Sequence, residues 1–431
     1  MQVNGIITEY NPFHHGHKYQ LEESRRLTGA DFTVVAMSGN FVQRGAPALL
    51  DKHTRAEMAL RCGADLVLEL PVLYALSSSE AFAAGAVALL DRLGPVTHLC
   101  FGSECGDTGK LAPIASVLLE EPKQYRSCLQ KCLRQGLSYP AARLQALAQC
   151  PGLPDDTPEL LASPNNILGI DYMKALLKRK SAMRPLTVKR IGQGYHDGYV
   201  PFRDTPDGRQ TLPPQDDSPS SPPALSAYAI RQALQEKNGL FLSLPHMPPE
   251  AGELLRSYLA DHKAMESDDF SQVLYYKLLL EKENGYEKYL DVSPGLSDRI
   301  RRHLKDFRGF TDFCDTLKTK DMTYTRIARC MLHILLGLEK VHMASGKSLD
   351  YAPYAKVLGF RRRAAPLLHA IKDRSSLIFL PKLADAGQKL PPEAFALLKL
   401  DLLASEIYHG IASSRSGLPL PNELSTPLII L

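Results

Sequence analysis

Short apolar segments alternate with amphipathic ones through the first half of this chain. Strands are predicted at Val3–Ile7, Asp31–Met37, Ala64–Pro71, Val96–Gly102 and Pro185–Gly192. The segments between them carry apolar residues at helical spacing, as in Leu50–Gly63, where Asp51 is a potential N-cap. Near-continuous apolar strands joined by helices form a parallel sheet that is covered on both faces. The sequence therefore predicts an α/β fold with a doubly wound, Rossmann-like parallel sheet.

The pattern changes after residue 200. Residues 201–224 are rich in proline and poor in aliphatic side chains, which predicts a flexible loop or linker. A short return helix follows within residues 225–238. From residue 239 to residue 431, apolar residues recur at helical spacing and no strand is predicted. The expected organisation is an α/β domain over residues 1–200, the linker, the return helix and a predominantly α-helical C-terminal domain.

The composition fits a protein of the cytoplasm. None of the eight cysteines forms a CxxC pair, which disfavours a zinc ribbon and suggests a reducing compartment. The apolar run Ala81–Leu90 is too short to cross a bilayer, and the N-terminus lacks a signal-peptide pattern. The formal net charge of +4 permits an anionic partner without requiring one. We expect a cytoplasmic protein without membrane contact.

A histidine-rich turn, NPFHHGH, follows the first predicted strand at Asn11–His17. Ligands of open parallel sheets bind at the carboxyl ends of the strands, and the free N–H groups of a following helix attract anions. His14 and His17 are three residues apart, so on a helix they point the same way. Two imidazoles there can donate hydrogen bonds to the oxygens of a triphosphate. Gly16 removes a side chain where a base or ribose would approach the backbone.

Two alternatives for this turn are weighed against phosphate binding. A zinc site needs three or four ligands, whereas HHGH supplies at most three crowded ones and no HExxH motif accompanies it. We therefore predict no metal site. The second alternative is that the turn is an ordinary helix start that happens to contain histidines. The chain has no GxGxxG after the first strand and no P-loop motif, which argues against those two nucleotide-binding classes.

At these residues the chain resembles a known superfamily. The turn is similar to the HxGH signature of nucleotidyltransferases and class I aminoacyl-tRNA synthetases. A fuller set of segments resembles the bacterial tRNA(Met) cytidine acetate ligases: GIITEYNPFHHGHKYQL, MSGNFVQRGAPALLDKHTRAEMAL, GADLVLELP, FGSE, SPNNILGIDYMKAL and KRIGQGYHD. The resemblance is strong over residues 1–235 and weaker through the helical half, for example in YAKVLGFRRR. It implies a HIGH-type nucleotidyltransferase fold followed by a helical, tRNA-binding domain.

The resemblance also implies a reaction. Such an enzyme activates acetate with ATP to acetyl-adenylate, releasing pyrophosphate. It then transfers the acetyl group to N4 of the wobble cytidine of elongator tRNA(Met), which gives N4-acetylcytidine and AMP. ATP is thus a co-substrate, and Mg²⁺ is expected to accompany it. Acetate and elongator tRNA(Met) are the expected partners.

The site residues follow from the same resemblance. His14 and His17 would be catalytic, stabilising charge on the phosphates. The segment that forms the ATP cradle would comprise Ile7, Thr8, Glu9, Tyr10, Asn11, Pro12, Phe13, His14, His15, Gly16, His17, Lys18, Tyr19 and Gln20. The nucleotide would also be contacted at Gly102, Asn166, Arg190 and Ile191.

One motif departs from the superfamily pattern. Nucleotidyltransferases usually carry S-[ST]-T-x-I-R, whose hydroxyl and N–H groups hold the triphosphate. Residues 226–231 read SAYAIR here, so Ala227 and Tyr228 stand where hydroxyl residues are usual. A direct phosphate contact of these two side chains is therefore in doubt. Arg231 keeps a phosphate role in this interpretation, since it lies near a helix start.

Further basic residues have two interpretations. Arg44, Lys52 and Arg55 follow the second strand and either contact phosphate or RNA, or lie on a solvated helix face. In the second half, the basic clusters Arg299–Arg308, Lys318–Arg329 and Phe360–Pro366 suit tRNA phosphates, and aromatics such as Tyr324 can stack on unpaired bases. The same clusters are also consistent with solvent-exposed faces of helices that bind no RNA.

Two other functions stay open at this point. A small-molecule adenylyltransferase would share the HxGH motif and the fold, but it would not need the long helical half. A non-catalytic RNA-binding protein would not need intact His14, Gly16 and His17. For the amine of the cytidine, Glu104 and His196 are weak candidates for a base.

Overall fold

The structure is a computed structural model of the chain. It describes residues 1–190, 225–236 and 238–431. The predicted linker over residues 201–224 and the predicted contact residue Ile191 lie outside the described residues.

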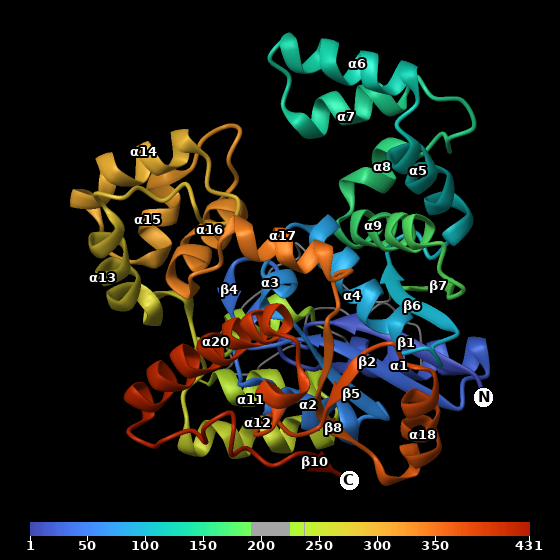
Figure 1. Ribbon diagram of the computed structural model, residues 1–431, viewed down its shortest axis with the longest axis vertical. Helices are drawn as coiled ribbons and strands as arrows, with labels where there is room; N and C mark the ends of the chain where they lie inside the picture. The colour runs from blue at the N-terminus through green and yellow to red at the C-terminus, as the bar shows by residue number, and fades with distance from the viewer. Residues whose placement is uncertain (191–224, 237) are drawn as a thin grey trace, which may run out of the picture.

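An eight-stranded sheet forms the centre of the molecule (Figure 1). Its strands are β1 (Val3–Thr8), β2 (Phe32–Ser38), β5 (Leu66–Leu70), β6 (His98–Ser103), β7 (Arg184–Lys189), β8 (Tyr354–Phe360), β9 (Ile378–Leu380) and β10 (Ile429–Ile430). The order is β10-β8-β5-β2-β1-β6-β7, and β9 pairs with β8. The five strands from β5 to β7 are parallel, as predicted, and the strand order reverses between β1 and β6.

Helices cover both faces of this sheet. One face is covered by α1 (His15–Thr28), α2 (Lys52–Arg61) and α12 (Pro249–Asp261), and the other by α4 (Ser79–Arg92), α5 (Thr108–Glu120) and α9 (Pro164–Arg179). Neighbouring residues of β2 point to opposite cores, since Val34 packs on the α4 side and Val35 on the α2 side. Both faces being buried explains the near-continuous apolar strands of the sequence.

Capping residues fix the ends of these helices, and the predicted cap at Asp51 is confirmed. The Asp51 carboxylate accepts hydrogen bonds from the backbone N–H groups of His53 and Thr54, at 2.8 and 3.1 Å, and so caps α2. Ser78 caps α4 in the same way. Gly29 ends α1 with a φ of 63°, a left-handed conformation that favours glycine.

The remaining elements form two lobes and several connections. Short elements of the first half are β3 (Phe41–Val42), β4 (Ala46–Pro47), α3 (Val72–Ala75), α6 (Lys123–Arg134), α7 (Tyr139–Leu147) and α8 (Thr157–Ala162). Later elements are α10 (Ala227–Ala233), α11 (Gly239–Ser243), η1 (Leu244–His246), η2 (Ser267–Phe270), α13 (Ser271–Glu281), α14 (Pro294–His303), η3 (Leu304–Asp306), α15 (Phe310–Leu317), α16 (Tyr324–Leu336), α17 (Lys340–Ser348), η4 (Arg362–Ala364), α18 (Ala365–Arg374), α19 (Ala386–Lys389) and α20 (Pro392–Ser416). In Figure 1, α6 and α7 project from the body, and α13 to α16 form a second lobe.

The second half is predominantly helical, but the prediction that it contains no strand was wrong. Strand β8 pairs antiparallel with β5, and β9 and β10 flank it in parallel. Lys356 interrupts the apolar run of β8, and its charge is balanced inside the protein by carboxylates that are remote in sequence. The predicted division at residue 239 stays a prediction, and the chain beyond it shares the central sheet. Across the described residues, no helix has the length and apolarity needed to span a membrane.

Candidate nucleotide-binding site

The histidine turn lies at the carboxyl edge of the sheet, where strands β1, β6 and β7 end. Residues 9–14 connect β1 to α1. Gly102 is the penultimate residue of β6, and a Cβ atom built on it would be 3.5 Å from the Cγ atom of Arg190. Arg190 directly follows β7, and its backbone N–H donates to the carbonyl of Ser103 at 3.0 Å. The fold thus brings the turn, Gly102 and Arg190 to one edge, beside the point where the strand order reverses.

The two signature histidines cap the helix that they begin. Nδ1 of His14 accepts a hydrogen bond from the backbone N–H of Gly16 at 3.0 Å. Nδ1 of His17 accepts one from the backbone N–H of His14 at 3.3 Å. A neutral imidazole that accepts at Nδ1 carries its proton on Nε2. Both rings therefore keep an Nε2–H donor for a ligand, and they lie together with their centroids 3.8 Å apart.

Gly16 is required by this arrangement. A Cβ atom on residue 16 would lie 2.8 Å from Cε1 of His14. A side chain there would displace the ring from its capping position. The structural reason for the glycine is thus the imidazole of His14, in addition to the ligand approach that the sequence suggested.

Burial keeps both imidazoles neutral. Desolvation, followed by the positive charges of Arg190 and other nearby groups, lowers the pKa of His14 to about 3. Burial, the neighbouring His14 and the charge of Arg190 hold the pKa of His17 well below its ordinary value. Neutral rings donate hydrogen bonds at neutral pH without carrying charge. The positive charge at this edge comes from arginines.

Aromatic packing on its buried side fixes the histidine turn. Tyr10 and Phe13 are buried, and their rings lie 4.7 Å apart. Both rings also contact the ring of His17, at centroid distances of 4.8 and 5.5 Å. The Asn11 side chain accepts a hydrogen bond from the backbone N–H of Leu49 at 2.7 Å. These contacts hold the cradle rigidly against α1 and the segment before α2.

Arg231 reaches the same turn from the return helix. Ser226 caps α10 by accepting from the backbone N–H of Ala229. One turn later, Nη1 of Arg231 donates to the carbonyl of Asn11 at 2.6 Å. Its charge contributes to the lowered pKa of His14, as does that of His246. Arg231 therefore lies beside the cradle, while its contact with phosphate stays a prediction. His246 is a neighbour that no sequence pattern pointed to.

Asn166 and Glu104 are engaged with each other's backbone. The side-chain oxygen of Asn166 accepts hydrogen bonds from the backbone N–H groups of Glu104 and Cys105, at 3.0 and 3.1 Å. The Glu104 carboxylate accepts from the backbone N–H groups of Asn165 and Asn166, at 3.3 and 2.9 Å. These bonds pin the start of α9 to the end of β6. Glu104 thus has a structural role, which weakens it as a base, and His196 lies outside the described residues.

The remaining predicted cradle residues lie where the motif places them. Ile7 and Thr8 end β1, Pro12 lies in the turn, and His15, Lys18, Tyr19 and Gln20 occupy the first turns of α1. Glu9 accepts a hydrogen bond from the backbone N–H of Gln43 at 2.8 Å. Within the described part of the chain, no group of three or more His, Cys, Asp or Glu residues is arranged to hold a metal ion.

Lys52 and Arg55 are not surface residues. Both side chains are fully buried, so the interpretation that they contact phosphate or RNA was wrong, and so was the alternative of a solvated helix face. Lys52 donates to the carboxylate of Glu69, and Arg55 donates to backbone carbonyls. A helical pattern shows which residues share a face of the helix. It does not show whether a basic residue on that face is buried against a partner elsewhere in the chain.

Comparisons with known proteins agree on one family. The family model described as HIGH Nucleotidyl Transferase matches residues 1–205 and 208–417. The chain is 37% identical to the tRNA(Met) cytidine acetate ligase of Acetivibrio thermocellus, over 95% of this chain and 94% of the relative. It is 39% identical to the enzyme of the same name from Clostridium kluyveri, with the same coverage. The crystal structure of Thermotoga maritima TmcAL bound with alpha-thio ATP superimposes with a TM-score of 0.87 at 30% identity, covering both chains completely.

Proposed function

This chain belongs to the HIGH nucleotidyltransferase family, and with its relatives named as tRNA(Met) cytidine acetate ligases we propose that it is an ATP-dependent acetate–tRNA ligase. It activates acetate as acetyl-adenylate and transfers the acetyl group to N4 of the wobble cytidine of elongator tRNA(Met). The relatives match over nearly their full length, including the helical half. That half is what a small-molecule adenylyltransferase would lack, so the relatives support the ligase over that alternative.

One observation carries the proposal. Two neutral imidazoles at the start of α1 keep their Nε2–H groups for a ligand, because each ring uses Nδ1 to cap the helix. Arg190 and Arg231 provide charge beside them. Fixed donors and cations at a helix N-terminus suit the phosphates of ATP, and the alpha-thio ATP complex of the Thermotoga maritima neighbour supports the same ligand here.

The chemistry needs positioning more than acid–base catalysis. An acetate oxygen attacks the α-phosphorus in line, the Pα–O bond to the β-phosphate breaks, and pyrophosphate leaves. His14 and His17 donate to phosphate oxygens that gain charge in this step. N4 of the cytidine then attacks the acetyl carbon, the bond to the AMP oxygen breaks, and N4 loses a proton. Acetate is already ionised near neutral pH and needs no base for the first step.

Mg²⁺ fits as a companion of ATP. Mg²⁺ is commonly held by one or two carboxylates together with substrate phosphates. The described residues provide no cage of three or more acidic or histidine ligands. The ion would therefore enter on the phosphates, where it supplies charge neutralisation, with Arg190 and Arg231 completing that neutralisation from the protein side.

The tRNA is proposed to contact the helical half. Two of the predicted basic clusters, residues 299–308 and 318–329, lie in the lobe formed by α14 to α16 (Figure 1). The third, residues 360–366, follows β8 on the other side of the molecule. Arg363 of that cluster pairs with the buried carboxylate of Asp65 at 2.7 Å, so it serves the fold. The lobe of α13 to α16 carries two of the three basic clusters and is the proposed surface for phosphate contacts.

The decisive experiment separates the two half-reactions. Purified protein is assayed for ATP–pyrophosphate exchange with and without acetate, and labelled acetate is then followed onto tRNA(Met). Acetate-dependent exchange with label on tRNA(Met) is the expected result. Exchange that ignores acetate, or label that appears equally on a tRNA with another wobble base, contradicts the proposal.

A further inference from the structure

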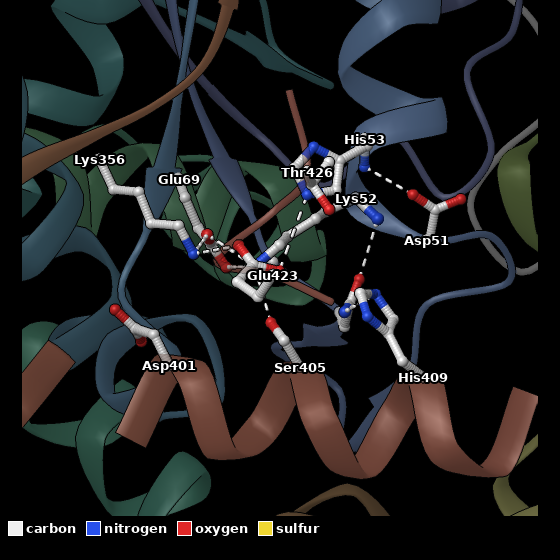
Figure 2. A network of polar contacts seen from close by, with 12 residues as sticks. Asp51, Lys52, His53, Glu69, Lys356, Asp401, Ser405, His409, Glu423 and Thr426 are labelled. Atoms are coloured by element: carbon white, nitrogen blue, oxygen red, sulfur yellow. Dashed lines mark hydrogen bonds and ion pairs between the residues drawn. The ribbon is translucent and has the colours of Figure 1, made fainter. Parts of the chain in front are cut away.

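A buried polar network joins α2 and β5 of the first half of the chain to β8, α20 and the C-terminal tail. Figure 2 shows its members, which come from α2, β5, β8, α20 and the C-terminal tail: Lys52, His53, Glu69, Lys356, Asp401, Ser405, His409 and Glu423. Lys52 is fully buried, and Lys356, Glu69 and Glu423 are each at most 4% exposed. The network lies outside the nucleotide site described above, and the reaction proposed there does not use it.

Lys52 is the centre of this network. Its Nζ donates to both carboxylate oxygens of Glu69 at 2.9 Å and to Oγ of Ser405 at 2.7 Å. Glu423 of the tail completes the set, with an oxygen 2.8 Å from Nζ of Lys52 and 2.5 Å from Nζ of Lys356. Two lysines thus face two glutamates, one of which is contributed by the tail.

The two lysines hold the tail carboxylate ionised. Burial opposes the charged form of Glu423, but Lys52 and Lys356 outweigh it and hold its pKa far below the ordinary value. His53 lies 3.7 Å from the same carboxylate. On the other side of the network, Asp401 accepts hydrogen bonds from the Tyr354 hydroxyl and from the backbone N–H of Val72. Glu423 is therefore the residue of the network whose buried charge is supplied by an irregular segment, the tail after α20.

Helix α2 connects this network to the cradle. Lys52 is its first residue, and its backbone N–H donates to the side chain of Asn40 at 2.9 Å. Arg55 lies one turn on, and its guanidinium is fully buried. Nη1 of Arg55 donates to the carbonyl of Glu9 at 2.6 Å and to that of Ser38 at 3.1 Å, and Nη2 donates to the carbonyl of Gly39.

The contacts of Arg55 fix the backbone on which the histidine turn begins. Glu9 is the first residue after β1, and the turn to His14 follows it directly. Gly39 is held from its other side too, since a Cβ atom there would lie 2.3 Å from Oε1 of Glu69. A shift of Lys52 or Glu69 would therefore move α2, Arg55 and the loop after β2 together, because a close-packed interior transmits small displacements.

We propose that Glu423 is a positioning residue for the ATP cradle, acting through Lys52 and Arg55 of α2. It makes no contact with the histidine turn itself; it seats Lys52, which fixes the start of α2, and Arg55 of that helix fixes the carbonyl of Glu9. The inference rests on the proposed function, since it assigns ATP to that cradle. The C-terminal tail is then part of the machinery that orders the nucleotide site.

Glu423→Gln is the variant that tests this, because it keeps the size of the side chain and removes the charge. Glu423→Asp keeps the charge and serves as the conservative rescue. Glu406→Gln is the matched control, the same substitution on the exposed side of α20 close to Ser405. Each full-length protein is measured for ATP binding by calorimetry without acetate or tRNA, for KM and kcat in acetate-dependent exchange, and for thermal unfolding.

The expected result is that Glu423→Gln raises the Kd and the KM for ATP about tenfold, measured at a temperature well below the unfolding midpoint of the variant. Glu423→Asp recovers part of this loss, and Glu406→Gln matches the wild type. A Glu423→Gln protein that melts earlier but binds ATP as tightly as the wild type overturns the proposal. If Glu423→Gln does not fold, the charge-balanced Glu423→Gln/Lys356→Met protein replaces it, with the same two outcomes.

A double-mutant cycle tests the route through α2. Arg55→Lys alone should weaken ATP binding, because an ammonium group cannot replace a planar guanidinium that donates to four carbonyls. If Glu423 acts through Arg55, its substitution adds little in the Arg55→Lys background, and fully additive effects overturn that route. Failure of the wild type to bind ATP would instead contradict the proposed function. Tight ATP binding without transfer to tRNA would contradict only the assigned substrate, so the two failures are distinguishable.

Discussion

The backbone N–H of His14 donates a hydrogen bond to Nδ1 of His17, 3.3 Å away, so one nitrogen of the His17 ring serves the helix and the other stays available. Asparagine places an oxygen near the position of Nδ1 and has nothing at the position of Nε2. His17→Asn should therefore keep the cap and lose the donor. We expect the rate of acetate-dependent exchange to fall by about 10²–10³, the usual effect of removing one preorganised donor.

Thermal stability is the control for the His17→Asn prediction, because it reports on the helix cap and not on the Nε2–H donor. Thermal unfolding of His17→Asn should stay close to that of the wild type, while His17→Ala should lose both activity and about 1 kcal/mol of stability. His369→Ala, on the exposed α18, should change neither. An asparagine variant with wild-type exchange would show that Nε2 of His17 does not act on the phosphates.

Stability should fall with acidity because His14 is buried as a neutral ring. Its pKa is about 3 in the folded protein, against about 6.5 in an unfolded chain. Between these values the unfolded chain binds the extra proton, so the free energy of unfolding falls as pH falls below 6.5, by at most about 1.4 kcal/mol per pH unit. Above pH 6.5 this contribution is fully present.

Asp401 acts in the opposite direction over part of this range. Burial and the charge of Glu69 raise its pKa to about 6, so below that pH the folded protein binds the extra proton. Comparing His14→Gln with the wild type removes this shared contribution. In urea unfolding from pH 7 to pH 5, the variant should show the flatter dependence, and parallel curves would mean that His14 is not buried as a neutral ring.

Burial should decide how much an ion pair contributes to stability. Lys52 and Lys174 each lie 2.9 Å from a glutamate oxygen, but Lys52 is fully buried whereas the Glu80 partner of Lys174 is 65% exposed. Lys52→Met leaves the buried carboxylates of Glu69 and Glu423 with Lys356 as their shared lysine and should cost about 3–5 kcal/mol in urea unfolding. Lys174→Met should cost about 1 kcal/mol or less. Similar losses for both would indicate that water screens the buried network.

Two glycines with similar backbone angles should differ in their tolerance of alanine. Gly45 and Gly29 have φ angles of 79° and 63°. A Cβ atom on Gly45 would lie 2.5 Å from the backbone nitrogen of Arg329 in α16, whereas nothing lies within 4 Å of one on Gly29. Gly29→Ala should cost about 1 kcal/mol from backbone strain alone. Gly45→Ala should cost clearly more, measured by thermal unfolding, and equal losses would show that α16 yields without penalty.

The sequence predicted what depends on neighbours along the chain. The five parallel strands, the cap at Asp51 and the histidine turn all rest on short-range periodicity or on a local motif. The roles of Lys52 and Lys356 depend on Glu69 and Glu423, which no local pattern connects to them. A lysine in an apolar run argues against a buried strand until its partners are known. For that reason the sequence predicts no strand at residues 354–360, and both interpretations of Lys52, a phosphate or RNA contact and a solvated helix face, leave it accessible.

The position of strand β8 between β5 and β10 has a consequence for how the protein is made. Strand β5 is complete by residue 70, but its outer neighbour consists of residues 354–360, and the segment that carries Glu423 follows later still. During synthesis, the N-terminal sheet therefore emerges with one open edge and with Lys52 and Glu69 lacking half of their counter-charges. Open edges and long-range pairing slow folding and favour aggregation. The parallel strands are therefore closed on the β5 side by residues made much later than the histidine turn, so the N-terminal sheet completes its packing only after residues 354–360 and Glu423 have been translated.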